Sequence, residues 1–551
     1  MARRWCGTIA VIGLLARGAQ AQELRGVVRD SATAQPIPAA VLMLLDASGT
    51  TLGRNITNER GEFRIVLSPA IARLRVVRIG FRPRELPVPT TASIDILMRS
   101  LPTMLEPVRV SAGATCPRRS DDARTYALLE QARAGLLSVV VARDANPGAL
   151  VLLSFERTIE DNGDRIASQR VRIDSTVRAK TSFSAAHAAT DFVQRGFTGD
   201  SANQIIFYAP DADVLLDDGF AAGYCFRIAN AGADRPNEIG LAFSAADHRN
   251  GRIDIDGTLW VDTVARALRD IEFRYVGLGR AIELRRPGGR IAFSEMPNGT
   301  MLVDQWLLRL IATETDTIRI DVRKEIRTRF HAAENGGELA RAKWRDGSSW
   351  RGSLGTVRIS ARTTDGRPLV GAVAQLRDTH YRGVADANGD IEISDLVPGP
   401  YSVTLADARL GALGLVIPTT LTFVAQRDST VRASIVAHGA RDFVIDRCVA
   451  DRKYAPSDSV LLVGRAVDAD GQPLSGISIA LAEVFSATEE KRLPDIYTTG
   501  SDGVFAVCSK FLRRGMTLAV YARRRGSMLW TDEVRLDENL TVLRIPIGAR
   551  K

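Results

Sequence analysis

Lysine is nearly absent from this 551-residue chain, because only seven of its 73 basic residues are lysines and the others are arginines. Aromatic residues make up only 6% of the sequence. The formal net charge of +9 would suit a polyanion, but nucleic-acid surfaces gather basic and aromatic residues into one patch. Here the arginines are spread along every segment, which is typical of solvated strand faces. We therefore expect no nucleic-acid partner.

Long apolar runs are also missing, since no stretch of the chain reaches the roughly 20 apolar residues that a membrane-spanning helix needs. The first residues instead combine Arg3 and Arg4, a short apolar core from Gly7 to Leu15, and the small-x-small ending Ala19-Gln20-Ala21. This pattern predicts a secretory signal peptide at residues 1–21. We expect an exported protein, periplasmic, outer-membrane-associated or extracellular, that does not span a membrane once the signal is removed.

Cysteine is scarce as well. Cys6 lies in the signal peptide, and the four that remain are Cys116, Cys225, Cys448 and Cys508. An even number in an exported chain favours disulfides, although four cysteines allow three pairings. Pairing within each region would join Cys116 to Cys225 and Cys448 to Cys508, and free buried thiols are the alternative. The close Cys-x-x-Cys spacing of a zinc or redox site is absent.

Motifs that carry chemistry are equally rare. The sequence has no Gly-x-Ser-x-Gly, no phosphate-binding Gly-rich loop and no His-x-x-x-His. Two acidic clusters, at 211–218 and 254–256, have residue types that could bind Ca²⁺ or serve as general acids and bases, but Asp and Asn are also common in solvated turns. The stretch 386–390 imitates part of a calcium loop without its distal Glu. We assign no catalytic, cofactor-binding or metal-ligating residue and expect no cofactor.

What the sequence does contain is one pattern in three copies. Each copy has a short strand, a turn with proline, an apolar strand, and an Asn/Asp and Gly turn that leads into a third strand. The copies begin near Gly26, Val357 and Val463. Short alternating strands that repeat in this way indicate small β-sandwiches. Such modules more often bind ligands or act as spacers between other domains than catalyse reactions.

Residues 120–330, between the first two copies, follow a different pattern. Ser120-Asp121-Asp122 is a helix start, and the apolar spacing after it predicts a helix to about Ala142. Alternating strands follow from Leu150 to Leu310, with an Asn-Gly hairpin turn at 161–164. One helix against a long antiparallel meander predicts a curved open sheet or half-barrel, a shape that often encloses an apolar groove.

The three copies resemble the carboxypeptidase regulatory-like domain, a transthyretin-like sandwich of seven strands. The resemblance rests on the x-Pro-Ile/Leu turn, the Asn/Asp-x-x-Gly-x-Phe stretch and, in the second copy, the sequence from Leu396 to Val403. It covers about half of the chain. It indicates the fold of these modules but does not indicate which ligand they bind. The zinc site of carboxypeptidases lies on a separate α/β domain. His331 and Glu334 with His438 are a candidate zinc set, but the alternating strands and helices of that enzyme fold are missing.

Two further resemblances concern other segments. Leu105 to Ala112 is similar to the segment that follows a regulatory-like domain in TonB-dependent outer-membrane receptors, where it adds as a strand to its partner. The meander is similar to uncharacterised exported bacterial proteins and, around Trp260, to the half-barrels of periplasmic lipoprotein carriers. The latter similarity implies a groove for a lipid or another hydrophobic ligand.

The expected fold class is mainly β, with three transthyretin-like β-sandwich modules and a middle antiparallel meander or half-barrel domain that has one N-terminal helix. The predicted divisions are the signal peptide at 1–21, sandwich 1 at 23–99, a linker at 100–119, the helix and meander at 120–330, a linker at 331–353, sandwich 2 at 354–438, a connector at 439–459 and sandwich 3 at 460–549.

The sequence therefore predicts a non-catalytic binding or scaffolding protein of the cell envelope. A glycan is the ligand class that the carbohydrate-binding-like fold implies by analogy. Trp344, Trp350 and Trp530 are the candidates to stack on sugar rings, whereas Trp260 is expected in the core. The alternatives are a carrier of a lipid or hydrophobic small ligand in the middle domain, a zinc-dependent peptidase and a TonB-linked accessory protein. An envelope protein is a further candidate partner.

Overall fold

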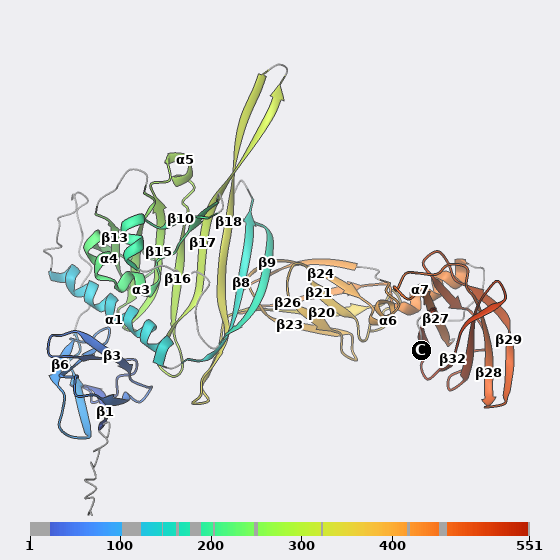
Figure 1. The fold of residues 1–551 in the computed structure, drawn as a ribbon, viewed down its shortest axis with the longest axis horizontal. Coiled ribbons are helices and arrows are strands. Elements are labelled where there is room, and N and C mark those ends of the chain that lie inside the picture. The colour runs from blue at the N-terminus through green and yellow to red at the C-terminus, as the bar shows by residue number, and fades with distance from the viewer. Residues whose placement is uncertain are drawn as a thin grey trace, which may run out of the picture. The chain divides into compact units, whose positions relative to one another are not determined.

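The computed structural model describes residues 22–101, 123–145, 147–160, 165–176, 189–201, 204–246, 252–320, 323–415, 419–450 and 460–548. The fold is mainly β, as predicted (Figure 1). The chain divides into two compact units. The first unit contains Met1–Leu152 and Asp174–Arg351, and the second contains Leu153–Ile173 and Gly352–Lys551. Among the described residues, no helix combines the length and the apolar character needed to cross a membrane.

Two sheets packed face to face form sandwich 1. The three-stranded sheet has the order β4-β1-β7 and comprises β1 (Gln22–Asp30), β4 (Glu62–Leu67) and β7 (Ser93–Met98). The four-stranded sheet has the order β3-β2-β5-β6 and comprises β2 (Val41–Leu45), β3 (Thr51–Ile56), β5 (Arg73–Val77) and β6 (Arg84–Pro87). Buried and exposed residues alternate along β4, so Phe63, Ile65 and Leu67 face the core.

The three sequence repeats share one hydrogen-bond pattern at their glycine turns. The first strand of each repeat donates a backbone N–H to the carbonyl of the turn glycine, at 2.8–2.9 Å: Val28 to Gly61, Ala361 to Gly389 and Ala466 to Gly503. All three glycines have a positive φ, between 68° and 76°. A Cβ at any of them would lie 2.5–2.6 Å from a backbone carbonyl oxygen. Only glycine fits this turn, which explains why it returns in every copy.

Sandwiches 2 and 3 repeat the architecture of sandwich 1 in the second unit, each with one three-stranded and one four-stranded sheet. The sheets of sandwich 2 have the orders β23-β20-β26 and β22-β21-β24-β25, formed by β20 (Gly355–Arg362), β21 (Val373–Leu376), β22 (Arg382–Val384), β23 (Asp390–Leu396), β24 (Gly399–Ala406), β25 (Thr419–Ala425) and β26 (Thr430–Val436). Those of sandwich 3 have the orders β30-β27-β33 and β29-β28-β31-β32, formed by β27 (Leu461–Val467), β28 (Ser478–Ser486), β29 (Glu489–Thr498), β30 (Val504–Val507), β31 (Thr517–Arg524), β32 (Ser527–Arg535) and β33 (Leu540–Pro546).

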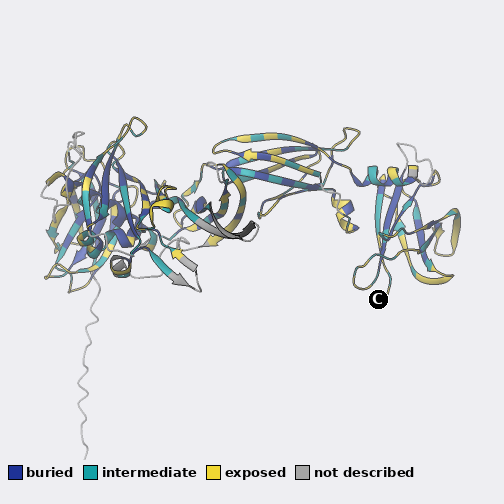
Figure 2. Cartoon of the chain, turned by 90° about the horizontal axis from the view of Figure 1, so that it is seen from above, coloured by how far each residue is buried: buried dark blue, intermediate teal, exposed yellow. Residues whose placement is uncertain are grey.

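The middle region forms the large antiparallel sheet that the sequence predicts. Its order is β12-β13-β14-β15-β16-β17-β18-β8-β9, and β19 pairs with β18. The strands are β8 (Ala149–Ile159), β9 (Ile166–Thr176), β12 (Tyr224–Asn230), β13 (Glu238–Ala245), β14 (Asp254–Asp262), β15 (Ala267–Val276), β16 (Gly288–Glu295), β17 (Met301–Ile320), β18 (Arg323–Lys343) and β19 (Ser349–Arg351). A separate hairpin pairs β10 (Thr198–Ser201) with β11 (Gln204–Phe207). Figure 2 shows buried and exposed residues in alternation along the strands.

Helix α1 (Ala123–Ala145) packs on this sheet, against β12, β13, β15 and β17. The sequence predicts this helix but not the four short ones that accompany it: α2 (Ala189–Arg195), α3 (Ala212–Leu216), α4 (Asp218–Gly223) and α5 (Arg280–Glu283). The inner face of the sheet carries closely packed aromatic rings, such as Phe220 on Tyr224 with centroids 4.0 Å apart. The apolar groove that we expected in this domain stays a prediction.

The same helix joins sandwich 1 to the middle domain. On its other side α1 packs against β2 and β3, and Val77 and Ile79 of the sandwich belong to the apolar core of the middle domain. Gln131 accepts a hydrogen bond from Gly80 N at 2.7 Å and donates one to Phe81 O at 3.3 Å. Because α1 is apolar nearly all round its middle turns, it can bury one side on each neighbour.

Sandwiches 2 and 3 are also joined by packing. The short helix α6 (Ala408–Ala412) and α7 (Ala440–Ala450) share an apolar cluster with β27 and β30 of sandwich 3. Asp407 caps α6 through Arg409 N and accepts from Ala440 N, both at 2.8 Å. The expected Cys448–Cys508 disulfide is present and fixes α7 to sandwich 3. Cys225 is also disulfide-bonded, but Cys116 lies outside the described residues, so the Cys116–Cys225 pairing stays a prediction.

Two sequence interpretations need correction. Residues 331–353, expected as a linker with a turn at 335–337, contain the second half of β18 and all of β19. Gly336 and Gly337 pair with Leu307 and Trp306 of β17, and the Trp306 ring packs closely against Gly337, which is a reason for glycine inside a strand. Trp344, expected to be exposed, is buried in the core of the middle domain.

Candidate functional site

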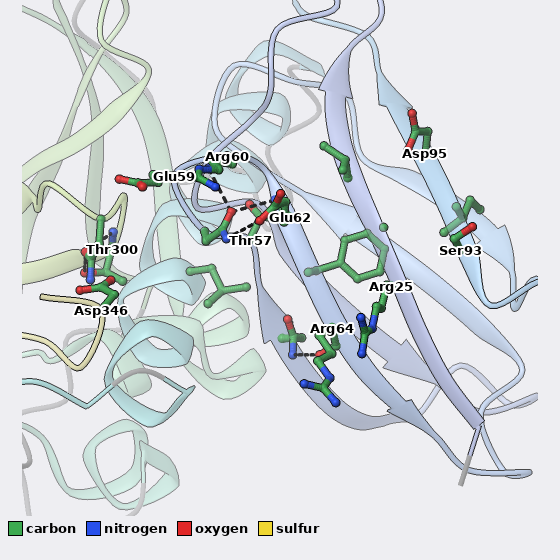
Figure 3. Close-up of a pocket in the computed structure, with 18 residues that line it drawn as sticks. Arg25, Thr57, Glu59, Arg60, Glu62, Arg64, Ser93, Asp95, Thr300 and Asp346 are labelled. Atoms are coloured by element: carbon green, nitrogen blue, oxygen red, sulfur yellow. Dashed lines mark hydrogen bonds between the residues drawn. The ribbon is translucent and has the colours of Figure 1, made fainter. Parts of the chain in front are cut away.

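A groove of ≈ 850 Å³ lies in the first unit, along the outer face of the three-stranded sheet of sandwich 1 (Figure 3). The sandwich provides most of its wall through residues of β1, β3, β4 and β7 and the turn that precedes β4. The middle domain closes one end with Asn298, Thr300 and Asp346. Figure 3 shows Glu59 and Arg60 of the turn opposite Thr300 and Asp346. The volume lies within the range of about 300–1,000 Å³ that is usual for ligand pockets.

Strand pairing determines which side chains face the groove. Arg25 lies opposite Arg64 in the β1–β4 register, and on its other side it lies opposite Ser93 of β7. Residues opposite one another in a sheet point to the same face, so the three strands present a continuous row of polar side chains there. Phe63, one position before Arg64, points inward and is buried. The wall is therefore polar over an apolar core.

Glu23 holds the two arginines together at one end of the row. Arg25 Nε donates to its carboxylate at 2.8 Å, and the Arg64 guanidinium donates to its second oxygen at 2.7 Å. Hydrogen bonds from Arg25 and then Arg64 hold the pKa of Glu23 at about 2, well below its ordinary value. Because this carboxylate stays ionised, it pairs with both guanidinium groups, which keep further N–H groups that can bind a ligand.

The opposite end of the groove consists of two rigid turns. Asn58 Oδ1 accepts from Arg60 N at 3.0 Å and from Glu62 N at 2.9 Å, which fixes the turn before β4. In the middle domain, Ser348 donates its backbone N–H and its hydroxyl to Asp346, and the hydroxyl bond is the main cause of the lowered pKa of that carboxyl group. Hydrogen bonding within each turn orders these polar groups before any ligand arrives.

The chemistry of the groove suits hydrogen bonding. Its walls combine guanidinium, carboxylate, amide and hydroxyl groups. The carboxyl groups at or beside it with a shifted pKa, Glu23 and Asp346, are shifted downward, whereas a general acid needs a pKa raised towards neutral pH. The ring of Phe63 is covered, so among the described lining residues no aromatic face is open for a sugar to stack on. Recognition would rest on polar contacts.

The candidate zinc set does not have the geometry of a ligand set. His331 and Glu334 lie on strand β18, where residues three apart point to opposite faces of the sheet. His438 belongs to the second unit. Within the described ranges, no three His, Cys, Asp or Glu side chains are grouped so that they could hold a metal ion.

The acidic clusters have structural partners. Asp211 and Asp217 cap the N-termini of α3 and α4 by accepting from Val214 N and Gly219 N. Asp213 and Asp218 pair with Arg143 and Arg133, respectively, both on α1. These partners explain the cluster at 211–218 without calcium.

The other two acidic sites are similar. Asp254 accepts from Tyr224 and Arg252, and Asp256 pairs with Arg274. Asp386 Oδ1 accepts from the backbone at Asn388 and Asp390. Asp is a preferred N-cap residue, so Asp211 and Asp217 are the signals from which the short helices α3 and α4 could have been found.

No residue of the groove was selected from the sequence as a binding residue. Its side chains are mostly polar residues on strands and turns that belong to no binding motif. The pairing of β1 with β4 and β7 places those of the three strands side by side. The aromatic candidates lie elsewhere: Trp344 is buried, and Trp350 and Trp530 are partly buried against the cores of the middle domain and sandwich 3. Leu105 to Ala112, the candidate TonB segment, lies outside the described residues.

Comparison with known proteins identifies one domain. Residues 23–99 match the carboxypeptidase regulatory-like domain, so the chain contains such a domain, as predicted. No curated protein sequence matches the chain.

Solved structures with some likeness include the Bacillus anthracis TIE protein (12% identity, TM-score 0.16) and a streptococcal ancillary pilin (13% identity, TM-score 0.16). The first alignment covers 66% of each chain, and the second covers 47% of this chain and 81% of the pilin. The minor pilin of Streptococcus agalactiae has 13% identity and a TM-score of 0.14, over 36% of this chain and 97% of its own. TM-scores this low carry no argument about the fold or function of this chain.

Proposed function

We propose that this protein, with its carboxypeptidase regulatory-like domain at residues 23–99, is a non-catalytic binding and scaffolding component of the cell envelope. The groove on sandwich 1 is its ligand site, and a polar glycan is the ligand. The observation that carries this proposal is the ≈ 850 Å³ groove, whose walls offer ordered guanidinium, amide and carboxylate groups. Hydroxyl-rich chains are bound through such groups when each has a partner to satisfy it.

The packing between modules supports the scaffolding part of the proposal. Sandwich 1 contacts α1 through the buried side chains of Gln131 and Ile79. Sandwiches 2 and 3 are joined through α6 and α7, which share an apolar cluster with sandwich 3, and the disulfide fixes α7 there. Inter-domain contacts that are apolar and hydrogen-bonded resist relative motion, whereas small polar ones permit it. A protein built this way holds its binding surfaces at fixed positions within each unit.

Export also belongs to the proposal. It rests on the signal sequence at residues 1–21 and on the Cys448–Cys508 disulfide, because disulfides persist in oxidising compartments. Fractionation of cells that express the chain with its own leader tests it. Mature protein starting at Gln22 in the periplasmic or outer-membrane fraction supports export, and full-length protein in the cytosol contradicts it.

Binding is tested on the mature chain with an array of envelope glycans that includes peptidoglycan fragments and lipopolysaccharide oligosaccharides. We expect retention of at least one glycan, and Arg60→Gln should weaken it about tenfold, the effect of losing one charge-assisted hydrogen bond. Arg82→Gln is the matched control, since Arg82 is an exposed arginine of the same sandwich that does not line the groove. Failure to retain any glycan, or equal binding by both variants, refutes the site.

Metal analysis on the same preparation separates this proposal from the zinc peptidase. One zinc per chain, lost in His331→Ala, would overturn the non-catalytic assignment. The absence of zinc together with glycan binding would support it.

A further inference from the structure

A second cavity, of ≈ 340 Å³, lies between sandwich 1 and helix α1, apart from the groove. Its apolar surface comes from both sides: Met43 and Val77 of the sandwich, and Ala134, Leu137 and Leu216 of the middle domain. Met43 and Leu216 are partly buried members of the surrounding core, so apolar atoms remain open to the cavity. The volume lies at the small end of the usual range for ligand pockets, about 300–1,000 Å³.

Four arginines line the cavity: Arg54 and Arg75 on strands of sandwich 1, Arg78 just after β5, and Arg133 on α1. The carboxylates that line it are those of Glu130 and Asp218. Four positive and two negative side chains leave a net charge of +2 around a small space. Each carboxylate is already engaged, Glu130 with Arg75 at 3.4 Å and Asp218 with Arg133 at 2.8 Å. Neither of the other two arginines has a carboxylate partner among the lining residues, and Arg78 pairs only at 3.8 Å with Glu295, which does not line the cavity.

Arg78 is a buried cation with weak compensation. Its guanidinium is 8% exposed and donates to two backbone carbonyls, Pro38 O at 3.0 Å and Arg266 O at 3.4 Å. The carboxylate of Glu295 lies 3.8 Å away, beyond hydrogen-bond distance. Burial lowers the pKa of Arg78. A guanidinium that has lost water without gaining a close carboxylate is stabilised by any anion that enters the cavity it lines.

Arg54 is the accessible counterpart. It is exposed on β3, and it forms no ion pair with any residue in the part of the chain that the structure describes. Both ends of a binding site are therefore present: a cationic side with a buried and an exposed guanidinium, and an apolar wall on α1 and its neighbours. This combination matches a molecule with an anionic head and a compact apolar body.

We propose that the cavity between sandwich 1 and α1 binds a small amphipathic anion, a carboxylate or phosphate monoester on a short alkyl body. The head group pairs with Arg54 and Arg78, and the alkyl body lies against Val77, Ala134 and Leu137. Occupation of the cavity adds contacts to both faces of the junction. A ligand that binds the folded junction also stabilises it, by mass action.

The test uses the mature chain and isothermal titration with octanoate and with monooctyl phosphate, which distinguish the two head groups. Octan-1-ol is the control without charge, and inorganic phosphate is the control without the alkyl body. We expect one of the two amphipathic anions to bind at least tenfold more tightly than either control. Its affinity should fall as ionic strength rises, because exposed charges are screened.

Two arginine variants locate the site. Arg54→Gln should weaken binding about tenfold, whereas Arg99→Gln, an exposed arginine of sandwich 1 outside the cavity, should leave it unchanged. Both side chains are exposed, so both variants should melt at the wild-type temperature. Thermal unfolding checks this and should also show an upward shift with the bound anion that Arg54→Gln reduces.

Three results overturn the proposal. The first is no heat and no thermal shift with either amphipathic anion at millimolar concentration. The second is that octan-1-ol or inorganic phosphate binds as tightly as the anions, since binding would then not require both a charged head group and an alkyl body. The third is equal loss of affinity in Arg54→Gln and Arg99→Gln. None of these results bears on the glycan groove, because the groove and the cavity share no lining residue.

Discussion

Loss of the Cys448–Cys508 disulfide should destabilise sandwich 3 by about 4 kcal/mol. The bridge closes a loop of 60 residues. The chain-entropy relation gives about 14 cal/mol/K for a loop of that length, or about 4 kcal/mol at 25 °C. Both cysteines are buried, and the loop contains the connection from α7 to β27 and the strands β27 to β30. The double variant Cys448→Ala/Cys508→Ala removes this constraint from the unfolded chain.

Hydrogen exchange by mass spectrometry, at increasing urea, measures the effect where it should occur. A chain with several modules does not unfold in one step, so a global midpoint would mix their transitions. Peptides from β27 and β30 should lose protection at lower urea in the double variant, and peptides from β20 and β23 of sandwich 2 should change less. The two alanines also remove buried sulfur atoms, so the variant loses packing as well as the bond. Wild-type protein treated with a reductant is the control, because it loses the bond but keeps both sulfur atoms.

The reasoning fails if the variant and the reduced wild type lose less than about 1 kcal/mol in β27 and β30, since loop closure over 60 residues then contributes little. It also fails if reductant destabilises the double variant by the same amount as the wild type, since no bond in sandwich 3 remains to be broken. Equal loss in sandwiches 2 and 3 would place the effect at their junction.

Three other predictions concern residues of the first unit, and one of them uses a control residue from the second unit. Gln131→Leu leaves two buried backbone groups of sandwich 1 without partners, which should cost about 1–3 kcal/mol and speed hydrogen exchange at residues 79–82. Gly337→Ala brings a Cβ within 2.0 Å of a buried tryptophan ring and should lower thermal stability by about 1–3 kcal/mol, whereas Gly411→Ala, in a helix with open space around it, should be neutral or stabilising. Arg64→Gln should raise the pKa of Glu23 from about 2 towards 4.5 in a ¹³C NMR titration of labelled glutamate. The sign follows from the lowered pKa, since the Glu23 ion pairs are complete above pH 4.5 and are lost as pH falls towards 2.

The sandwiches were predictable because their signals are local. A turn that needs a positive φ admits only glycine, so Gly61, Gly389 and Gly503 mark the same point in three modules. The alternation of buried and exposed residues in strands such as β4 is equally visible in the sequence. Helix α1 was found from its apolar spacing, and the Cys448–Cys508 pair from its position.

The candidate sites were not predictable, because they depend on which distant strands pair and which modules touch. Arg25 and Arg64 are 39 positions apart, and they meet only through the β1–β4 register. The tryptophan at 344 looked exposed beside a charged turn, yet β18 carries it into the core. The His-x-x-Glu spacing looked like a ligand pair until the backbone around it proved to be a strand, on which the two side chains face apart.

By itself, the sequence determined the secondary structure of the modules, the repeat and the position of one disulfide, since each depends on residues close along the chain or on a single chemical type. Tertiary structure alone decided that sandwich 1 shares a core with α1, that a polar row lines its outer sheet, and that four arginines surround a small apolar cavity. The physical reason is that pairing register and packing between modules bring together side chains whose individual positions carry no signal.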